Sequence, residues 1–278
     1  MTAPIQLIIN ADDYGYFPCV SRGIITAAQT KAITATGILA TAPQLAEQLQ
    51  WLNGVAVDIG VHLNLTSGQP LTQAMRDALP RGQGLFPSAY TISGLVLTGK
   101  LPLNIVRAEW QAQIETCHSQ PLVFLNSHEH IHALPVLFPL VLELAKSHGI
   151  AHVRLPQADW LRPLTGAAVV RNSLMTLMRT VNQYRLTTPV PLFLGLSQSG
   201  KLTYDGVERL FSTLKAGQCY ELMCHVGYFA ADEITDPRLL AYHDWEAELR
   251  LLQSPELHAL YQRLNIQLSH YPHLLLNK

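Results

Sequence analysis

Two adjacent carboxylates, Asp12 and Asp13, end the segment that begins with the apolar run Ile5–Ile9. A run of this kind predicts a β-strand, in which successive side chains point to opposite faces. In a regular strand the two carboxylates would therefore face different sides, and at least one would face the space at the strand's end. An isolated Asp-Asp pair is more typical of a turn than of a catalytic site. Its meaning depends on what other strands bring to the same place.

Three histidines, His62, His128 and His225, stand at or just after the ends of other predicted strands. In α/β barrels the active site lies at the C-terminal ends of the strands. A single histidine there is more often a hydrogen-bonded core or loop residue, but several at one rim indicate a site. Two imidazoles and a carboxylate provide three ligands and leave positions open for water and substrate, as in catalytic metal centres.

The segment Ser127-His-Glu-His-Ile-His132 offers more than one candidate ligand. His128 and His132 would share the face of a helix, whereas His128 and His130 would share the face of a strand. We expect the strand to stop at Ser127, which places His128 closest to the rim. His130 and His132 are then expected to support the ligands or to line the pocket.

The rest of the chain predicts the elements that would position these side chains. Apolar stretches near residues 7, 38, 59, 124, 153, 193, 222 and 267 alternate with helical ones, which predicts βαβ units and a mostly parallel sheet. No GxGxxG follows the first strand, so a dinucleotide-binding sheet is disfavoured. We expect an α/β fold, a distorted TIM-like (β/α) barrel of seven or eight strands forming one domain over 1–278. Residues 66–100, rich in Gly, Pro, Ser and Thr, are expected to form a long loop.

The composition restricts the class of protein. Of the 278 residues, 48% are hydrophobic and 14% are charged, against about 25% charged in an average domain, which supports a large core. The net charge of -1 provides no basic surface for nucleic acid, and no apolar run is long enough to span a membrane. Without a secretory leader or a CxxC pair, the chain is expected to be cytoplasmic, with reduced cysteines.

Four motifs of the chain occur in the same order in a known family. They are Asn10-Ala-Asp-Asp-Tyr-Gly15, Gly60-Val-His-Leu-Asn-Leu-Thr66, Ser127-His-Glu-His-Ile-His132 and Glu221-Leu-Met-Cys-His-Val-Gly-Tyr228. Together they resemble the YdjC-like carbohydrate deacetylases, and the likeness covers nearly the whole chain. The resemblance implies a distorted barrel of the glycoside hydrolase and deacetylase type. It also implies metal-dependent removal of the acetyl group from an N-acetylated amino sugar, either a chitooligosaccharide or a GlcNAc-bearing glycolipid such as a hopanoid.

Carried over motif by motif, the resemblance also implies roles for individual residues. Asp13, His62 and His128 would bind one divalent metal ion, Mg²⁺ or Zn²⁺. Asp12 would be the general base that takes a proton from water, and His225 the general acid that protonates the departing amine.

The sequence singles out five further positions without fixing a role for each. Glu129 and Val226 depart from the family pattern, in which many members have histidine and proline, and both departures can alter the shape of the pocket. Arg154 is interpreted as orienting a carboxylate, as contacting the substrate or as part of a surface ion pair. Tyr14 and Tyr228 are interpreted either as faces on which a sugar stacks or as packing residues.

Two other functions stay open at this point. A sugar isomerase or phosphoesterase would be expected to show further carboxylate ligands or a denser Asp/His set, and neither is evident. An inactive sugar-binding homologue is disfavoured by the presence of all five proposed active-site residues. A homodimer is expected only because most soluble oligomers are homo-oligomers.

Overall fold

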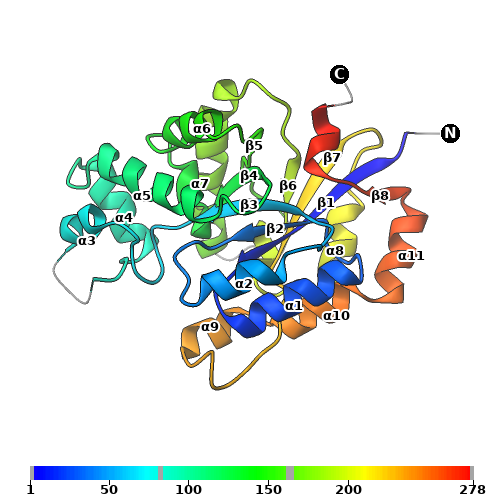
Figure 1. Cartoon of the computed structure of the whole chain (residues 1–278). Coiled ribbons are helices and arrows are strands. Elements are labelled where there is room, and N and C mark those ends of the chain that lie inside the picture. Colours follow the sequence, from blue (N-terminus) through cyan, green and yellow to red (C-terminus); the bar gives the residue numbers. More distant parts are fainter. Residues whose placement is uncertain (1–2, 81–83, 161–165, 276–278) are drawn as a thin grey trace.

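The structure, a computed structural model, describes residues 3–80, 84–160 and 166–275 (Figure 1). Its centre is one curled sheet of parallel strands in the order β5-β4-β3-β2-β1-β7-β6. The eighth strand pairs with Ile5–Leu7 of β1. Because β7 pairs with Gln6–Ala11 of β1, β8 and β2 share the opposite edge of that strand. The strands are β1 (Ile5–Tyr14), β2 (Ala35–Ile38), β3 (Asp58–Leu63), β4 (Leu122–Ser127), β5 (His152–Val153), β6 (Leu192–Leu194), β7 (Cys219–Cys224) and β8 (Ile266–Leu268).

The expected distorted barrel is confirmed, but the sheet is a half-barrel that does not close. β5 and β6 lie at the two ends of the strand order, and no pairing joins them in the described part of the chain. Both strands are short, with two and three residues. Pro156 follows β5 closely and Pro191 immediately precedes β6. Because proline has no backbone N–H to donate to a ladder, these prolines limit how far either edge can extend.

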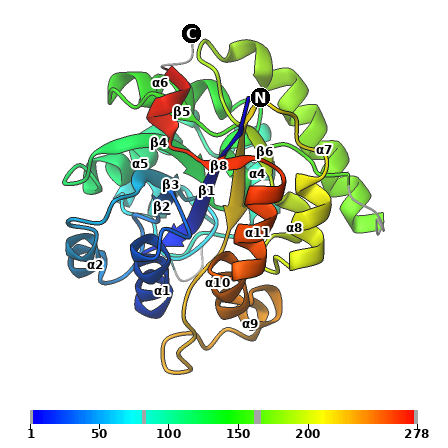
Figure 2. The ribbon, with the colours of Figure 1, turned by 90° about the vertical axis from the view of Figure 1, so that its right-hand side faces the viewer.

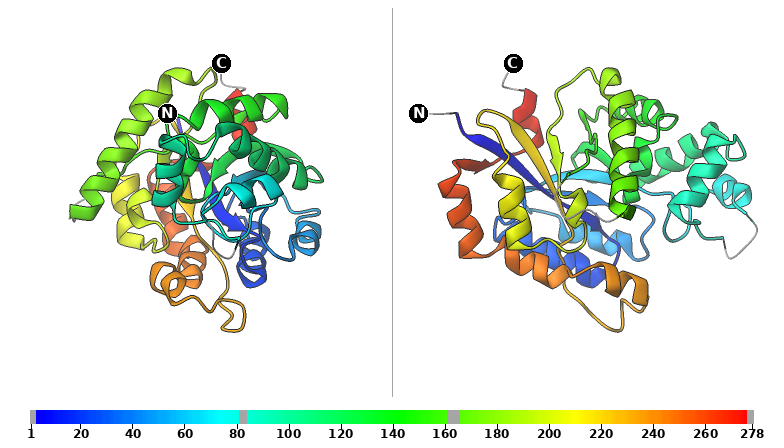
Figure 3. Two further views of the ribbon diagram at one scale, coloured as in Figure 1. Left: turned by 90° about the vertical axis from the view of Figure 1, so that its left-hand side faces the viewer. Right: turned by 180° about the vertical axis from the view of Figure 1, so that it is seen from behind.

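Helices surround the strands, as Figure 2 shows from the end of the sheet at which β1 begins. Figure 3 shows α3 and α4 away from the sheet, beyond the C-terminal ends of the strands. The helices are α1 (Pro18–Gln29), α2 (Leu45–Trp51), α3 (Gln73–Ala78), α4 (Ala89–Leu97), α5 (Leu103–Thr116), α6 (Phe138–Ser147), α7 (Gly166–Asn182), α8 (Tyr204–Phe211), α9 (Pro237–Tyr242), α10 (Trp245–Leu252) and α11 (Pro255–Arg263). Short 3₁₀ turns are η1 (His128–Ala133), η2 (Gln183–Arg185), η3 (Leu196–Gln198) and η4 (Tyr271–Leu275).

The region 66–100, expected to be a long loop, instead contains α3 and α4. Thr72 and Ser88 cap these two helices with their hydroxyl groups. The buried Glu109 of α5 accepts hydrogen bonds from the backbone N–H groups of Leu71 and Thr72 and from the Thr72 hydroxyl. The serine and threonine content that suggested a loop therefore includes the caps of α3 and α4, and the start of α3 is held against α5.

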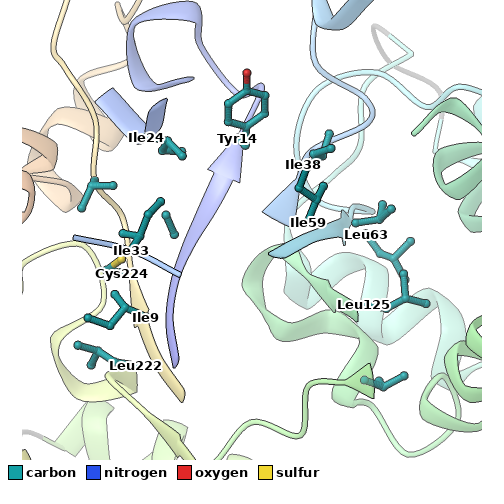
Figure 4. Packing of buried hydrophobic residues seen from close by; sticks show 14 of the residues in the cluster. Ile9, Tyr14, Ile24, Ile33, Ile38, Ile59, Leu63, Leu125, Leu222 and Cys224 are labelled. Carbon is teal, nitrogen blue, oxygen red and sulfur yellow. The ribbon is translucent and has the colours of Figure 1, made fainter. Parts of the chain in front are cut away.

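The core follows the apolar parts of the central strands. Ile9, Leu63, Leu125 and Leu222 are fully buried, and Figure 4 shows them on β1, β3, β4 and β7. Strands of a parallel sheet covered by helices are typically apolar along most of their length. The polar side chains near the C-terminal ends of these same strands are exceptions to that rule, and they form the site described next.

Candidate active site

The end of β1 brings both carboxylates to the same place through a break in the strand's regularity. The pairing with β2 shifts register between Ala11 and Tyr14, and Asp13 has a left-handed backbone with φ of 70°. Aspartate tolerates this conformation better than most residues, and such an irregularity disturbs the alternation of side chains. His62 consequently contacts both carboxylates: its Nδ1 lies 3.9 Å from Asp12 Oδ1 and its Nε2 lies 3.2 Å from Asp13 Oδ1.

Asp13 lies between two histidines in a geometry that fits a metal ion. Its Oδ1 is 3.2 Å from His62 Nε2 on β3 and 3.0 Å from His128 Nδ1, directly after β4. The three residues each offer one ligand atom, and these atoms lie within 4.8 Å of one another. Ligand atoms at about 2.0–2.1 Å from a tetrahedral zinc ion would be about 3.3 Å apart. The spacing of this cluster is therefore close to what a small divalent cation requires.

The buried charges also favour a divalent cation. Asp12, Asp13 and Glu221 bring three formal negative charges, and Arg154 brings one positive charge, with all four side chains at most 2% exposed. Two negative charges are left without a cation among these four, and uncompensated buried charge is costly. Two imidazoles and a carboxylate are typical zinc ligands. The residues present therefore fit a divalent metal ion.

Asp12 is held in place by Arg154 and Asn126. The Arg154 guanidinium donates to both carboxylate oxygens at 2.6 and 2.9 Å, and Asn126 Nδ2 donates to Oδ1 at 2.9 Å. Burial acts to raise the pKa of Asp12, but the charge and hydrogen bonds of Arg154, together with His62 and His225, outweigh it and lower the pKa to about 2. Asp12 is therefore ionised at neutral pH. Because Arg154 is buried, it is not a surface ion pair.

A further carboxylate, Glu221 on β7, holds Arg154 from another side. Arg154 Nε donates to Glu221 Oε1 at 2.6 Å. Asn10 Nδ2 donates to the same oxygen at 3.3 Å and to the Tyr271 hydroxyl at 3.0 Å. Sequence reasoning assigned no role to Glu221 or Asn126. The signal that could have identified them is that each is a polar residue within an otherwise mostly apolar predicted strand.

His225 reaches the site from the residue after β7. Its Nε2 lies 4.0 Å from Asp13 Oδ2. The other oxygen of this carboxylate, Oδ1, is the one closest to His62 and His128. Its backbone N–H donates to Glu248 at 2.7 Å, and its ring lies beside that of His243, with centroids 5.0 Å apart. Burial lowers the pKa of the His225 imidazole, while the carboxylates of Asp13 and Asp12 act in the opposite direction.

The turn after β4 separates the three neighbouring histidines. Glu129 and His130 both have left-handed backbones, with φ of 50° and 55°, so neither helical nor strand spacing applies. His128 alone among the three faces Asp13. The His132 ring lies between Ser127 Oγ at 2.5 Å and the backbone oxygen of Arg154 at 2.9 Å, and it therefore supports the turn.

His130 packs beside the cluster and does not contact Asp13. Its ring meets that of Phe193 edge to face, with centroids 5.4 Å apart. The guanidinium carbon of Arg154 lies 5.2 Å from the centre of the same Phe193 ring. His130 and Phe193 thus help to enclose the guanidinium that holds Asp12.

The structure places the two candidate tyrosines away from this cluster. The Tyr14 hydroxyl donates to the backbone oxygen of Gln48 at 2.6 Å, and Figure 4 shows its ring at the end of β1 above the apolar core. The Tyr228 hydroxyl donates to Thr26 of α1 at 3.0 Å. Tyr16, which the sequence did not single out, packs against the His128 ring with centroids 5.6 Å apart. Its position two residues beyond Tyr14 was the only signal.

A family model described as YdjC-like protein matches residues 6–263. The chain belongs to the YdjC-like family. A relative from Geobacillus stearothermophilus named carbohydrate deacetylase is 32% identical over 81% of this chain and 80% of its own length. The human carbohydrate deacetylase is 26% identical over 95% of this chain and 89% of its own length.

A solved structure has the same fold as this chain. It is from Enterococcus faecalis and is described as a cellobiose-phosphate cleavage protein. It superimposes with a TM-score of 0.73 at 23% identity, covering 98% of this chain and 99% of that one.

None of the helices within the described residues combines the length and apolar character needed to cross a membrane.

Proposed function

We propose that this protein is a metal-dependent hydrolase that removes the acetyl group from an N-acetylated amino sugar and releases acetate. The observation that supports the proposal most strongly is the cluster of buried Asp13 and His62 with the partly exposed His128, which has Asp12 and His225 beside it. Relatives named carbohydrate deacetylase support the reaction class. The substrates we propose are chitooligosaccharides or a GlcNAc-bearing glycolipid.

Asp13, His62 and His128 would hold the metal ion, Zn²⁺ or Mg²⁺. His62 presents Nε2 and His128 presents Nδ1 toward the Asp13 carboxylate. When bound, the ion would polarise the acetyl carbonyl and make water a better nucleophile. Because the protein supplies three ligands, the site keeps room for water and substrate.

Asp12 would accept the proton from the attacking water. Arg154 keeps the Asp12 carboxylate ionised, which is the state a general base needs. Three hydrogen bonds from Arg154 and Asn126 also fix the plane of the carboxylate. A base held in one orientation loses less entropy when the reacting groups align.

His225 would give a proton to the nitrogen of the departing sugar amine. The nitrogen of the sugar is a poor leaving group if it departs as an amide anion. The reaction therefore requires a proton donor near the carbon–nitrogen bond that breaks. Burial lowers the pKa of His225, which makes its protonated form a stronger acid. Its position at the second oxygen of Asp13 puts it within the same small site as the metal ligands.

The test is acetate release from N-acetylglucosamine oligosaccharides and glycolipids by metal-free protein, with and without added Zn²⁺ or Mg²⁺. We expect metal-dependent release that is lost in His128→Ala. The matched control is His118→Ala, since His118 is an exposed histidine that pairs with His148 outside the site. Metal binding without acetate from any substrate would contradict the deacetylase and return attention to a sugar isomerase or phosphoesterase.

We also propose, from the sequence, that the protein is a single domain, acts in the cytoplasm and forms a homodimer. Analytical ultracentrifugation tests the last of these statements. A monomer at micromolar concentration would contradict it.

A further inference from the structure

One amide connects the proposed general base to a proposed metal ligand. Asn126 lies on β4, two residues before His128, and is fully buried. Its Nδ2 is 2.9 Å from Asp12 Oδ1, and its Oδ1 is 2.8 Å from His62 Nδ1. Both polar ends of this side chain are therefore used, and both partners belong to the proposed active site.

The direction of the two hydrogen bonds follows from the chemistry of the groups. The ionised Asp12 carboxylate can only accept hydrogen bonds. The amide must therefore direct its NH₂ group to Asp12 and its oxygen to His62. Since an amide oxygen can only accept, His62 must donate from Nδ1. The hydrogen on Nδ1 leaves Nε2 as the ligand atom, and Nε2 is the atom that lies 3.2 Å from Asp13.

A glycine on the neighbouring strand makes room for this contact. Gly37 on β2 faces the pair, and a Cβ built there would lie 3.1 Å from Asn126 Oδ1 and 3.2 Å from His62 Cβ. Both distances are tighter than most Cβ contacts in proteins, so the neighbouring atoms would have to move by a few tenths of an ångström. A side chain at position 37 would therefore press on the amide and on the imidazole together.

We propose that Asn126 is a positioning residue that selects the metal-binding tautomer of His62 and, with the same amide, orients the Asp12 carboxylate. The proposal rests on the proposed function for the identity of the base, and it extends that function to a residue that touches neither the metal nor the substrate. Hydrogen bonds of this kind from metal-ligating histidines typically contribute about 10–100-fold to metal affinity.

The first measurement is zinc affinity by calorimetry on metal-free protein. We expect Asn126→Leu to bind zinc about 10–100-fold more weakly than the unchanged chain. Asn126→Asp keeps an acceptor for His62 Nδ1 but replaces the donor to Asp12, so it is expected to retain zinc affinity and to lower kcat more than it changes KM. The matched control is Asn172→Leu, which removes another fully buried asparagine, one that donates to the backbone of Asp159 at 2.7 Å.

The second measurement is the ¹⁵N spectrum of the His62 ring in zinc-loaded protein. Nδ1 should carry a slowly exchanging hydrogen in the unchanged chain and in Asn172→Leu, and this hydrogen should exchange faster with water in Asn126→Leu, which has no acceptor for it. Gly37→Ala keeps the amide but crowds it, so we expect a loss of zinc affinity smaller than that of Asn126→Leu. Asn126→Asp and Gly37→Ala also supply the test if Asn126→Leu does not fold.

The proposal would be overturned if Asn126→Leu left both the zinc affinity and the exchange rate of the His62 Nδ1 hydrogen unchanged. The same holds if Asn172→Leu weakens zinc binding as much as Asn126→Leu does, because the effect would then be a general loss of packing. If the unchanged chain binds zinc with the expected tautomer but releases no acetate, the proposed function fails and the role of Asn126 in zinc binding stands.

Discussion

Two groups of buried polar side chains differ in how their carboxylates are satisfied. Glu109 on α5 accepts hydrogen bonds from two backbone N–H groups, from the Thr72 hydroxyl and from the Gln113 amide. All of these donors are neutral. Asp12 and Asp13 instead face Arg154, His62 and His128, which carry or can acquire positive charge.

This difference distinguishes a structural anchor, Glu109, from the candidate active site that contains Asp12 and Asp13. Neutral donors fix Glu109 in one arrangement and attach the start of α3 to α5. The Asp12 and Asp13 cluster leaves negative charge that a cation can balance, and its imidazoles can exchange a proton for a metal. Buried carboxylates are thus informative about function when their partners are titratable.

The largest expected effect is on catalysis. Replacing Asp12 with Asn should lower the rate of acetate release about 10²–10⁴-fold, the usual contribution of a general base, because the amide cannot take the proton. Zinc affinity should stay close to that of the unchanged chain, since Asp13, His62 and His128 remain. Steady-state kinetics with calorimetry measure both quantities. A variant with normal turnover would show that Asp12 resembles Glu109 in being structural only.

The next effect is on folding. Arg154→Met should lower the free energy of unfolding by about 3–5 kcal/mol, because Asp12 and Glu221 lose the guanidinium that they share. Urea denaturation of metal-free protein, followed by circular dichroism, measures the loss. Little change in the urea midpoint would indicate that the two carboxylates are reached by water, contrary to their burial.

A pH-dependent effect is expected at His132. Burial lowers its pKa to about 3, so the folded protein keeps the neutral ring while the unfolded chain protonates it near pH 6.5. The stability associated with His132 is thus complete above pH 6.5 and decreases as the pH falls toward 3, by about 2 kcal/mol between pH 7 and pH 5.

Urea midpoints of the unchanged chain and of His132→Gln, compared across that range, measure this contribution. The gap between the two proteins should narrow as the pH falls. A gap that stays constant with pH would contradict the lowered pKa.

The smallest expected effect concerns Glu109, which anchors the start of α3 to α5. Glu109→Gln should lower the free energy of unfolding by about 1–2 kcal/mol, because the amide NH₂ would face backbone N–H groups that need an acceptor. Acetate release per folded molecule and zinc affinity should be unchanged. Loss of zinc affinity in this variant would show that the two buried groups are coupled, and it would contradict a purely structural role for Glu109.

Much of the site could be predicted because it depends on local patterns. An apolar run that ends in a polar residue marks the C-terminal end of a strand, and Asp12, Asp13, His62, His128 and His225 were found in this way. Parallel strands place such ends at one edge, and the three histidines lie within 4.0 Å of Asp12 or Asp13 in the structure. The alternation of apolar strands and helical segments likewise predicted the parallel α/β sheet.

Other features were decided only by the tertiary structure. Left-handed backbones at Asp13, Glu129 and His130 are unfavourable locally and persist because surrounding contacts over-determine them, so strand and helix periodicity could not foresee which side chains would converge. The burial of Arg154 depends on Asp12 and Glu221, which are more than 60 residues away in the sequence. The open edge between β5 and β6 depends on pairing across the whole sheet. Sequence by itself determined which chemical groups stand at the strand ends, whereas long-range packing decided which of them face one another.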